Sequence, residues 1–181
     1  MTLHRPANVD DLNSLSEISA ALVKISEQIP LLFAVHPRTR ERLEKFDIDL
    51  GSMVIIEPLV YTDFLGLMAK ASVVLTDSGG IQEETTALGV KCITLRNNTE
   101  RPVTVAMGTN HVAGVKKAEI IAAFQKAVSV KPLTVGRPRL WDGHAGNRIV
   151  DVIESWLLNS TTMHSSDAAI SAGSSRAPVF P

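Results

Sequence analysis

The stretch LTDSGGIQEETTALG, residues 75–89, contains the residue types that bind anions. An apolar run ends just before Ser78-Gly79-Gly80, and a helical pattern follows. Free backbone N–H groups and the positive dipole end of a helix attract phosphate, and glycines let a ligand approach the backbone closely. Ser78 adds a hydroxyl donor. The pattern predicts an anion site here; the alternative is a tight strand-to-helix turn without a ligand.

Two carboxylates, Glu83 and Glu84, occupy the first turn of the helix that the pattern predicts. A carboxylate beside bare phosphate would repel it, but a carboxylate can accept two hydrogen bonds from a vicinal diol such as that of ribose. Amides for phosphate and a glutamate for ribose together describe a nucleotide site. The alternative is that the glutamates only complement the helix dipole, which can hold for one while the other binds.

Three residues outside this stretch could extend such a site. Arg101, in the segment LRNNTERPV, could deliver a guanidinium to a diphosphate, or it could form a surface Arg–Glu pair. His4, near the start, could do acid–base work or bind phosphate, or it could be a bystander. Phe64 lies on the apolar face of a predicted helix, where it could fill the core or stack on a base.

Apolar runs of strand length alternate with helical patterns along the chain, which indicates an α/β fold: a Rossmann-like parallel sheet with helices on both faces. We expect strands at 31–35, 53–56, 72–75, 91–95 and 111–113, and helices at 12–28, 39–46, 61–70, 81–88, 103–107, 118–128 and 147–158. Ligands of such sheets bind beyond the carboxyl ends of the strands. The polar candidates, with His36 and Glu57, fall at those ends.

The 181 residues carry a net charge of −1 and a 45% hydrophobic content, which favours one domain. We expect residues 1–158 to form it and the Ser/Ala-rich segment 159–181 to be a disordered tail. Nothing in the charge indicates a nucleic-acid or membrane partner, and no secretory signal is recognisable, so we expect a cytoplasmic protein. Cys92, in an apolar strand, is predicted to be a buried thiol. No residues have metal-ligand spacing.

The motifs, in their order, resemble those of the non-hydrolysing UDP-N-acetylglucosamine 2-epimerases. The resemblance covers residues 2–158 and is carried by TLHRPANVDDL, FAVHPRTR, DSGGIQEE, TERP and RLWDGHAGNRIVDVI. It implies a two-domain fold like that of GT-B glycosyltransferases, with the substrate between the domains. This chain resembles the carboxy-terminal, UDP-binding half.

The resemblance also implies a site. The residues that it assigns to UDP are Phe64, Ser78, Gly79, Gly80, Glu84 and Arg101. Among these, Glu84 would take the ribose hydroxyls, Arg101 the phosphates and Phe64 the uridine, while His4 matches a catalytic histidine. The reaction implied converts UDP-N-acetylglucosamine to UDP-N-acetylmannosamine by elimination and re-addition of UDP, without a cofactor or metal. The product feeds cell-surface polysaccharides.

The sequence departs from the family pattern at its start. The half that handles the C2 proton is absent, so we expect the chain to need an amino-terminal epimerase domain for catalysis, and the family suggests a possible homodimer. Only residues 1–3 precede His4, where the family has a full apolar strand, so we expect the sheet to lose a pairing partner. Two other readings remain: the donor-nucleotide domain of another GT-B glycosyltransferase, or a non-catalytic nucleotide-binding fragment.

Overall fold

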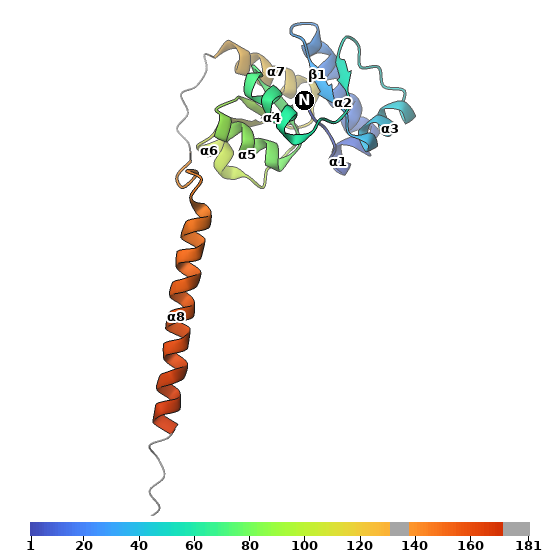
Figure 1. Cartoon of the computed structure of the whole chain (residues 1–181). Helices are drawn as coiled ribbons and strands as arrows, with labels where there is room; N and C mark the ends of the chain where they lie inside the picture. Colours follow the sequence, from blue (N-terminus) through green and yellow to red (C-terminus); the bar gives the residue numbers. More distant parts are fainter. Residues whose placement is uncertain (131–137, 172–181) are drawn as a thin grey trace, which may run out of the picture. The chain divides into compact units, whose positions relative to one another are not determined.

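The computed structural model describes residues 1–130 and 138–171, and side chains as far as residue 159. It divides the chain into two compact units, Met1–Pro138 and Arg139–Pro181 (Figure 1). The division falls before the predicted boundary between residues 158 and 159, because the last helix belongs to the second unit.

The first unit alternates short strands with helices, which confirms the α/β prediction. Its helices are α1 Pro6–Val9, α2 Leu12–Ser26, α3 Pro37–Lys45, α4 Tyr61–Lys70, α5 Gly79–Leu88, α6 Pro102–Ala106 and α7 Lys117–Ser129. Its strands are β1 Leu32–Ala34, β2 Val54–Ile56, β3 Val74–Thr76, β4 Cys92–Thr94 and β5 Asn110–Val112. Strand pairing is parallel throughout, in two sheets with the orders β1-β2 and β3-β4-β5.

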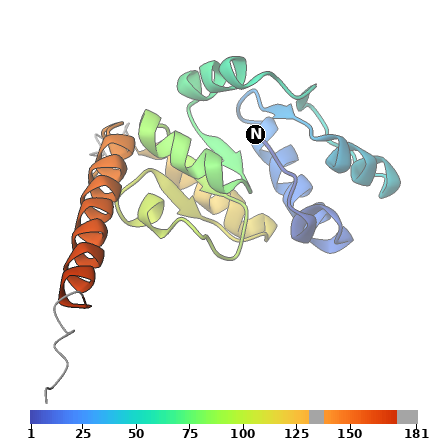
Figure 2. The same cartoon turned by 60° about the horizontal axis from the view of Figure 1, so that its bottom comes forward.

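The first two residues of the chain join the two sheets. The N–H of Ala34 donates to the carbonyl of Met1 at 3.2 Å, and the N–H of Thr2 donates to the carbonyl of Leu75 at 3.1 Å. Thr2 also forms a parallel bridge with Thr76. The blue start of the chain therefore lies between the two sheets (Figure 2). In place of a full strand, Met1 and Thr2 form a two-residue junction between the sheets.

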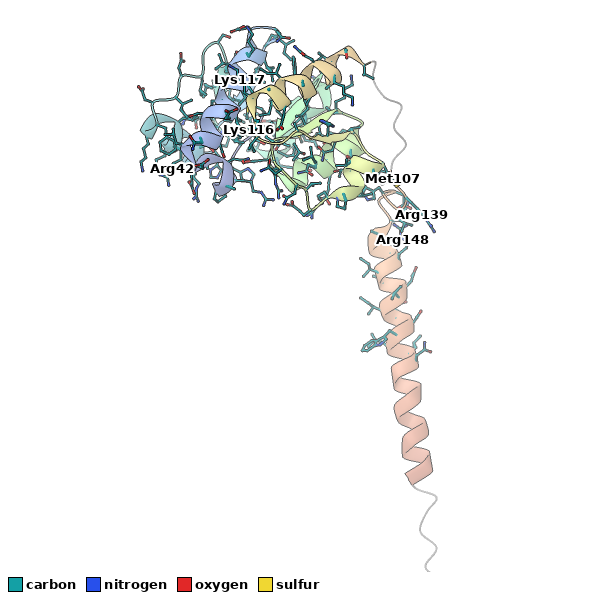
Figure 3. All side chains as sticks on the ribbon, turned by 180° about the vertical axis from the view of Figure 1, so that it is seen from behind. Arg42, Met107, Lys116, Lys117, Arg139 and Arg148 are labelled. Atoms are coloured by element: carbon teal, nitrogen blue, oxygen red, sulfur yellow. The ribbon has the colours of Figure 1, made fainter. Side chains whose placement is uncertain are left out.

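Two apolar clusters of described residues form the core of the first unit, and the larger one contains residues of both sheets. Its fully buried side chains include Leu15 and Leu22 of α2, Phe33 of β1, Ile93 of β4 and Phe124 of α7. Helices α2 and α7 pack against each other, and the start of α7, marked by Lys116 and Lys117, lies beside α2 (Figure 3). The backbone N–H of Lys117 donates to Glu17 of α2 at 2.8 Å.

The helix ends follow local chemistry. Asp10 and Asp11 could both cap α2 by residue type, and Asp11 does so by accepting from the N–H of Ser14 at 2.8 Å. Gly89 ends α5 in the left-handed region at φ 72°. Several predicted bounds differ from the structure by one or two residues; α5, for example, begins at Gly79 rather than two residues later. Helix α1 forms where no helix was predicted, because Pro6 fixes a helical φ at its first position.

The second unit contains α8, Ala145–Ser171. Arg148 of α8 holds the turn before the helix through an ion pair with Asp142 at 2.9 Å and a hydrogen bond to the carbonyl of Leu140 at 3.0 Å. The helix continues past its predicted end at residue 158 into the segment predicted to be a disordered tail. Residues 172–181 lie outside the described residues. No helix in the described ranges is long and apolar enough to cross a membrane.

Candidate functional site

A hollow of about 200 Å³ lies in the first unit where the polar strand ends come together. Residues that follow β1, β2 and β3 meet at this hollow. The side chains that line the hollow include His4, His36, Pro58, Leu59, Phe64 and Ser78. Three predicted site residues, His4, Phe64 and Ser78, therefore share one hollow.

His4 is held by a buried carboxylate. Nδ1 of His4 lies 3.0 Å from Oδ1 of Asp77, whose side chain is fully buried. A carboxylate only accepts, so Nδ1 carries the proton and Nε2 is the ring nitrogen left for a ligand. The half-exposed imidazole lines the hollow, so the arrangement can present an oriented proton acceptor or, once protonated, a donor.

Asp77 ties the first residues of the chain to the end of β3. Its carboxylate accepts from the backbone N–H groups of His4 and Arg5, the latter at 2.8 Å, and from the side-chain amide of Asn8 at 3.2 Å. Burial alone would raise the pKa of Asp77, but the hydrogen bonds from the His4 side chain and from the backbone N–H groups of Arg5 and His4 outweigh it and lower this pKa below its ordinary value. The carboxylate therefore stays ionised.

A second imidazole lies near the first. His36 caps α3, and its Nδ1 accepts from the N–H of Arg38 at 3.2 Å. The ring centroids of His4 and His36 are 6.1 Å apart. Both rings line the hollow, so it has one imidazole on the side of β1 and another on the side of β3.

The start of α5 leaves room for a ligand. Ser78 is the N-cap, and in the described part of the chain its side chain makes no capping hydrogen bond. A Cβ built on Gly80 would meet only Oγ of Ser78, at 4.0 Å, whereas one on Gly79 would lie 2.9 Å from Oε1 of Glu100. Gly80 is exposed at the start of α5, the place where an anion site would use free N–H groups.

Three guanidinium groups lie around this helix start. Arg5 and Arg96 both pair with Glu100. A hydrogen bond from its own backbone N–H lowers the pKa of Glu100 to about 2; burial opposes this, and the two arginines reinforce it. Arg101 instead pairs with Glu83 of α5, with Nε 2.8 Å from Oε1. The Arg–Glu alternative is therefore realised for Arg101, with a partner on the helix rather than in its own loop.

Glu84 and Arg101 are not among the residues that line the hollow. Glu84 is half-buried on α5, three residues after Ile81, which does line it. Residues three apart share a helix face, so Glu84 lies on the side of α5 that continues from the hollow. Arg101 is the N-cap of α6 and is 39% exposed.

Sequence reasoning placed His36 among the polar residues at the strand ends, but it did not find Asp77 as the partner of His4 or Glu100 as the partner of Arg5 and Arg96. The signal for Asp77 was present: an acidic residue directly after a buried strand needs partners. Cys92 is buried in β4, and burial raises the pKa of its thiol to about 11, which confirms the predicted inert strand thiol. Among the described residues, no group of three or more His, Cys, Asp or Glu side chains could hold a metal ion.

The parallel sheets with flanking helices place the first unit in the GT-B-like class of α/β folds. A family model described as UDP-N-acetylglucosamine 2-epimerase matches residues 1–154. The chain belongs to the UDP-N-acetylglucosamine 2-epimerase family.

Individual relatives agree. The chain is 39% identical over 165 residues to UDP-N-acetylglucosamine 2-epimerase of Methanocaldococcus jannaschii, across 84% of this chain and 43% of the relative. It is 32% identical to UDP-2,3-diacetamido-2,3-dideoxy-D-glucuronate 2-epimerase of Pseudomonas aeruginosa, across 84% of this chain and 43% of that relative. The M. jannaschii enzyme in complex with UDP-GlcNAc and UDP superposes with a TM-score of 0.78 at 40% identity, across 85% of this chain and 44% of that one. The chain therefore spans less than half the length of these relatives.

Proposed function

We propose that this chain is the UDP-binding half of a UDP-N-acetylglucosamine 2-epimerase, and that catalysis requires the amino-terminal domain as a partner. The observation that supports this is the shared hollow, where His4, held by Asp77, meets Phe64 and Ser78 beside the glycine start of α5. The oriented imidazole suits the reacting group, the aromatic ring suits the base, and the N–H groups at the start of α5 suit the phosphates.

The diphosphate would lie at the start of α5. The open space at Gly80 admits phosphate oxygens to the first N–H groups, and the helix dipole favours their negative charge. Ser78 supplies a hydroxyl, and Gly79, which is buried, leaves room for the Glu100 carboxylate beside it. Arg101 would exchange its Glu83 partner for phosphate, because a guanidinium binds phosphate through charge-assisted hydrogen bonds.

The uridine and ribose would lie along the apolar side of the hollow. Phe64 offers a ring for the base, between Pro58 and Leu59 of the loop after β2. Glu84, on the same face of α5 as Ile81, would accept from the ribose hydroxyls. This division accounts for carboxylates close to an anion site.

In the reaction, a base removes the proton at C2 of the sugar, the electron pair forms the C1–C2 double bond, and the C1–O bond breaks as UDP leaves. UDP then adds back to C1 while a proton is delivered to the opposite face of C2. The α5 amides and Arg101 would stabilise the charge that develops on the β-phosphate. His4, through Nε2, would act at this reacting end. The C2 base belongs to the amino-terminal domain.

The two relatives named above share UDP and a 2-epimerase reaction but differ in the sugar. That difference favours a common UDP site in this half. We propose the N-acetylglucosamine substrate on the higher identity to the M. jannaschii enzyme, with the diacetamido uronate as the second candidate. We also propose a cytoplasmic location and supply of the product to cell-surface polysaccharides.

Calorimetric titration with UDP, UMP and pyrophosphate tests the nucleotide site. We expect saturable binding that prefers UDP, and an about 30-fold loss in Arg101→Ala, the equivalent of roughly 2 kcal/mol for a charge-assisted contact. The matched control is Arg42→Ala, which removes a guanidinium of α3 that pairs with Asp10. This variant should bind UDP normally. If a cooperatively folded chain fails to bind UDP, the proposed function is wrong.

Glu84→Gln tests the ribose contact in the same titration. We expect weaker binding of UDP with unchanged binding of pyrophosphate, because only UDP carries the diol. The exposed Glu44 of α3 provides the control substitution Glu44→Gln. Equal losses for both ligands would remove Glu84 from the nucleotide site. Conversion of UDP-GlcNAc by the chain mixed with an amino-terminal epimerase domain, with solvent deuterium entering C2, would then test the reaction.

A further inference from the structure

A buried polar network lies behind the proposed phosphate site. It consists of Gln82, Thr94, Thr99, Thr104 and Asn110. Gln82 belongs to α5, two residues after the open helix start, and its side chain is fully buried. A fully buried glutamine is uncommon because an amide that loses water must find partners inside the protein.

The donors and acceptors of the network have one consistent assignment. The N–H of Arg101 donates to Oγ1 of Thr99 at 2.9 Å, and the Thr99 hydroxyl donates to Oε1 of Gln82 at 2.6 Å. Oε1 of Gln82 also accepts from the side-chain amide of Asn110 at 3.1 Å. The oxygen of Gln82 is therefore the common acceptor that holds the Thr99 hydroxyl in place.

The other side of Arg101 is fixed through the same network. Oγ1 of Thr104 donates to the carbonyl of Arg101 at 2.7 Å and accepts from the side-chain amide of Asn110 at 3.0 Å. Asn110 is oriented in turn by the hydroxyl of Thr94, 2.6 Å from its Oδ1. Both backbone groups of Arg101 are thus bound by hydroxyls that are themselves bound to the Gln82–Asn110 pair.

Gln82 is not a simple space-filling residue. Within the described residues, its Nε2 is buried and has no hydrogen-bond partner. An unpaired buried donor costs about 1–3 kcal/mol, which an apolar side chain of similar shape would avoid. The oxygen of the amide is the part that the structure uses.

We propose that Gln82, together with Asn110, is the positioning residue that holds Arg101 at the start of α5, so that diphosphate binding depends on a side chain that does not touch the ligand. The inference rests on the proposed function for the role of Arg101, and on the hydrogen bonds above for its position. Because Gln82 lies on the same helix as Ser78 and Gly80, one element carries both the amides and the fixed point for the guanidinium.

Two kinds of variant break the network. Gln82→Met removes the acceptor with little change of shape, and Thr99→Val removes the hydroxyl that Arg101 uses. Thr99→Ser keeps that hydroxyl and should behave as the unmodified chain. Thr109→Val is the matched control, because the Thr109 hydroxyl is buried and has no partner within the described residues.

Amide hydrogen exchange measures the position of Arg101 without any ligand. We expect Gln82→Met and Thr99→Val to speed exchange of the Arg101 amide about tenfold, with the amides in the middle of α5 unchanged. Thr99→Ser and Thr109→Val should leave it unchanged. An Arg101 amide that exchanges at the same rate in Gln82→Met as in the unmodified chain would overturn the proposal.

Ligand binding separates positioning from general stability. We expect Gln82→Met to weaken UDP about five- to tenfold, to leave uridine unaffected and to have no further effect in an Arg101→Ala background. Equal losses for UDP and uridine, or full additivity with Arg101→Ala, would overturn the positioning role. If the unmodified chain does not bind UDP, the proposed function fails, while the exchange experiment still decides whether Gln82 positions Arg101.

Discussion

Asp77 shows how one buried carboxylate organises the site. It binds the side chain of His4 and the backbone of His4 and Arg5, residues more than seventy positions away in the sequence. Its charge is stabilised because three N–H groups and an imidazole surround it. Loss of Asp77 would therefore affect both the fold at the chain start and the tautomer of His4.

Asp77→Asn should lower the free energy of unfolding by about 2 kcal/mol at pH 7, since hydrogen bonds to a charged group are lost. The hydrogen bonds lower the pKa of Asp77 in the folded state. Its contribution is thus complete above the unfolded pKa of about 3.9 and is lost as the pH falls through the lower folded value. Urea unfolding between pH 7 and pH 2 should show the two chains converging below about pH 4.

The exposed Asp63 of α4 provides the comparison. Asp63→Asn should change stability little and with no convergence at low pH. A difference for Asp77→Asn that stays constant down to pH 2 would show that the ionised carboxylate contributes nothing specific.

At the scale of elements, the glycines of α4 and α5 have different roles. Gly89 ends α5 at φ 72°, and a Cβ there would meet nothing within 4 Å. Gly66 lies inside α4 with equally open surroundings but ordinary helical geometry. The two positions therefore isolate the backbone effect of glycine from any effect of packing.

Gly89→Ala should lower the unfolding free energy by about 1 kcal/mol, because the left-handed region disfavours a Cβ. Gly66→Ala should raise it by about 0.5–1 kcal/mol, because alanine is the better helix former. Chemical unfolding of both variants measures the two signs. Destabilisation by both would indicate a steric cost at Gly66 that the structure does not contain.

The elements were largely predictable because their signals are local. The pattern over 61–70 gives both ends of α4, since an apolar stripe and strand-length flanks bound it. The start of α5 was wrong by two residues because Gly79 and Gly80 are poor helix formers that tertiary contacts place in the first turn. Partners such as Asp77 for His4 and Glu83 for Arg101 depend on how the strand ends meet, which no local pattern contains.

Among the residues whose side chains the structure describes, all members of the two core clusters precede residue 138, so α8 contributes no described side chain to either cluster. The family assignment followed from motifs spread over the chain, whereas the change in composition at residue 159 placed the predicted boundary inside α8 rather than at residue 138.

A chain ending at Pro138 should unfold in urea with the same midpoint as the full chain, because it keeps both core clusters. A chain ending before α7, at Lys116, should lose cooperative unfolding, because Ile120 and Phe124 are fully buried in the core. A lower midpoint for the chain ending at Pro138 would mean that the second unit contributes to the stability of the first.

The two-residue junction at Met1 and Thr2 means that a ligand in the hollow would contact two separately hydrogen-bonded sheets. The hollow takes His36 from the side of β1 and Ser78 from the side of β3, so its walls belong to separately hydrogen-bonded sheets. Below the junction the two halves are braced by α2 packed on α7. A ligand that spans both walls would hold the two sheets together. By thermodynamic linkage, it would stabilise their contact by the same free energy with which that contact strengthens its binding.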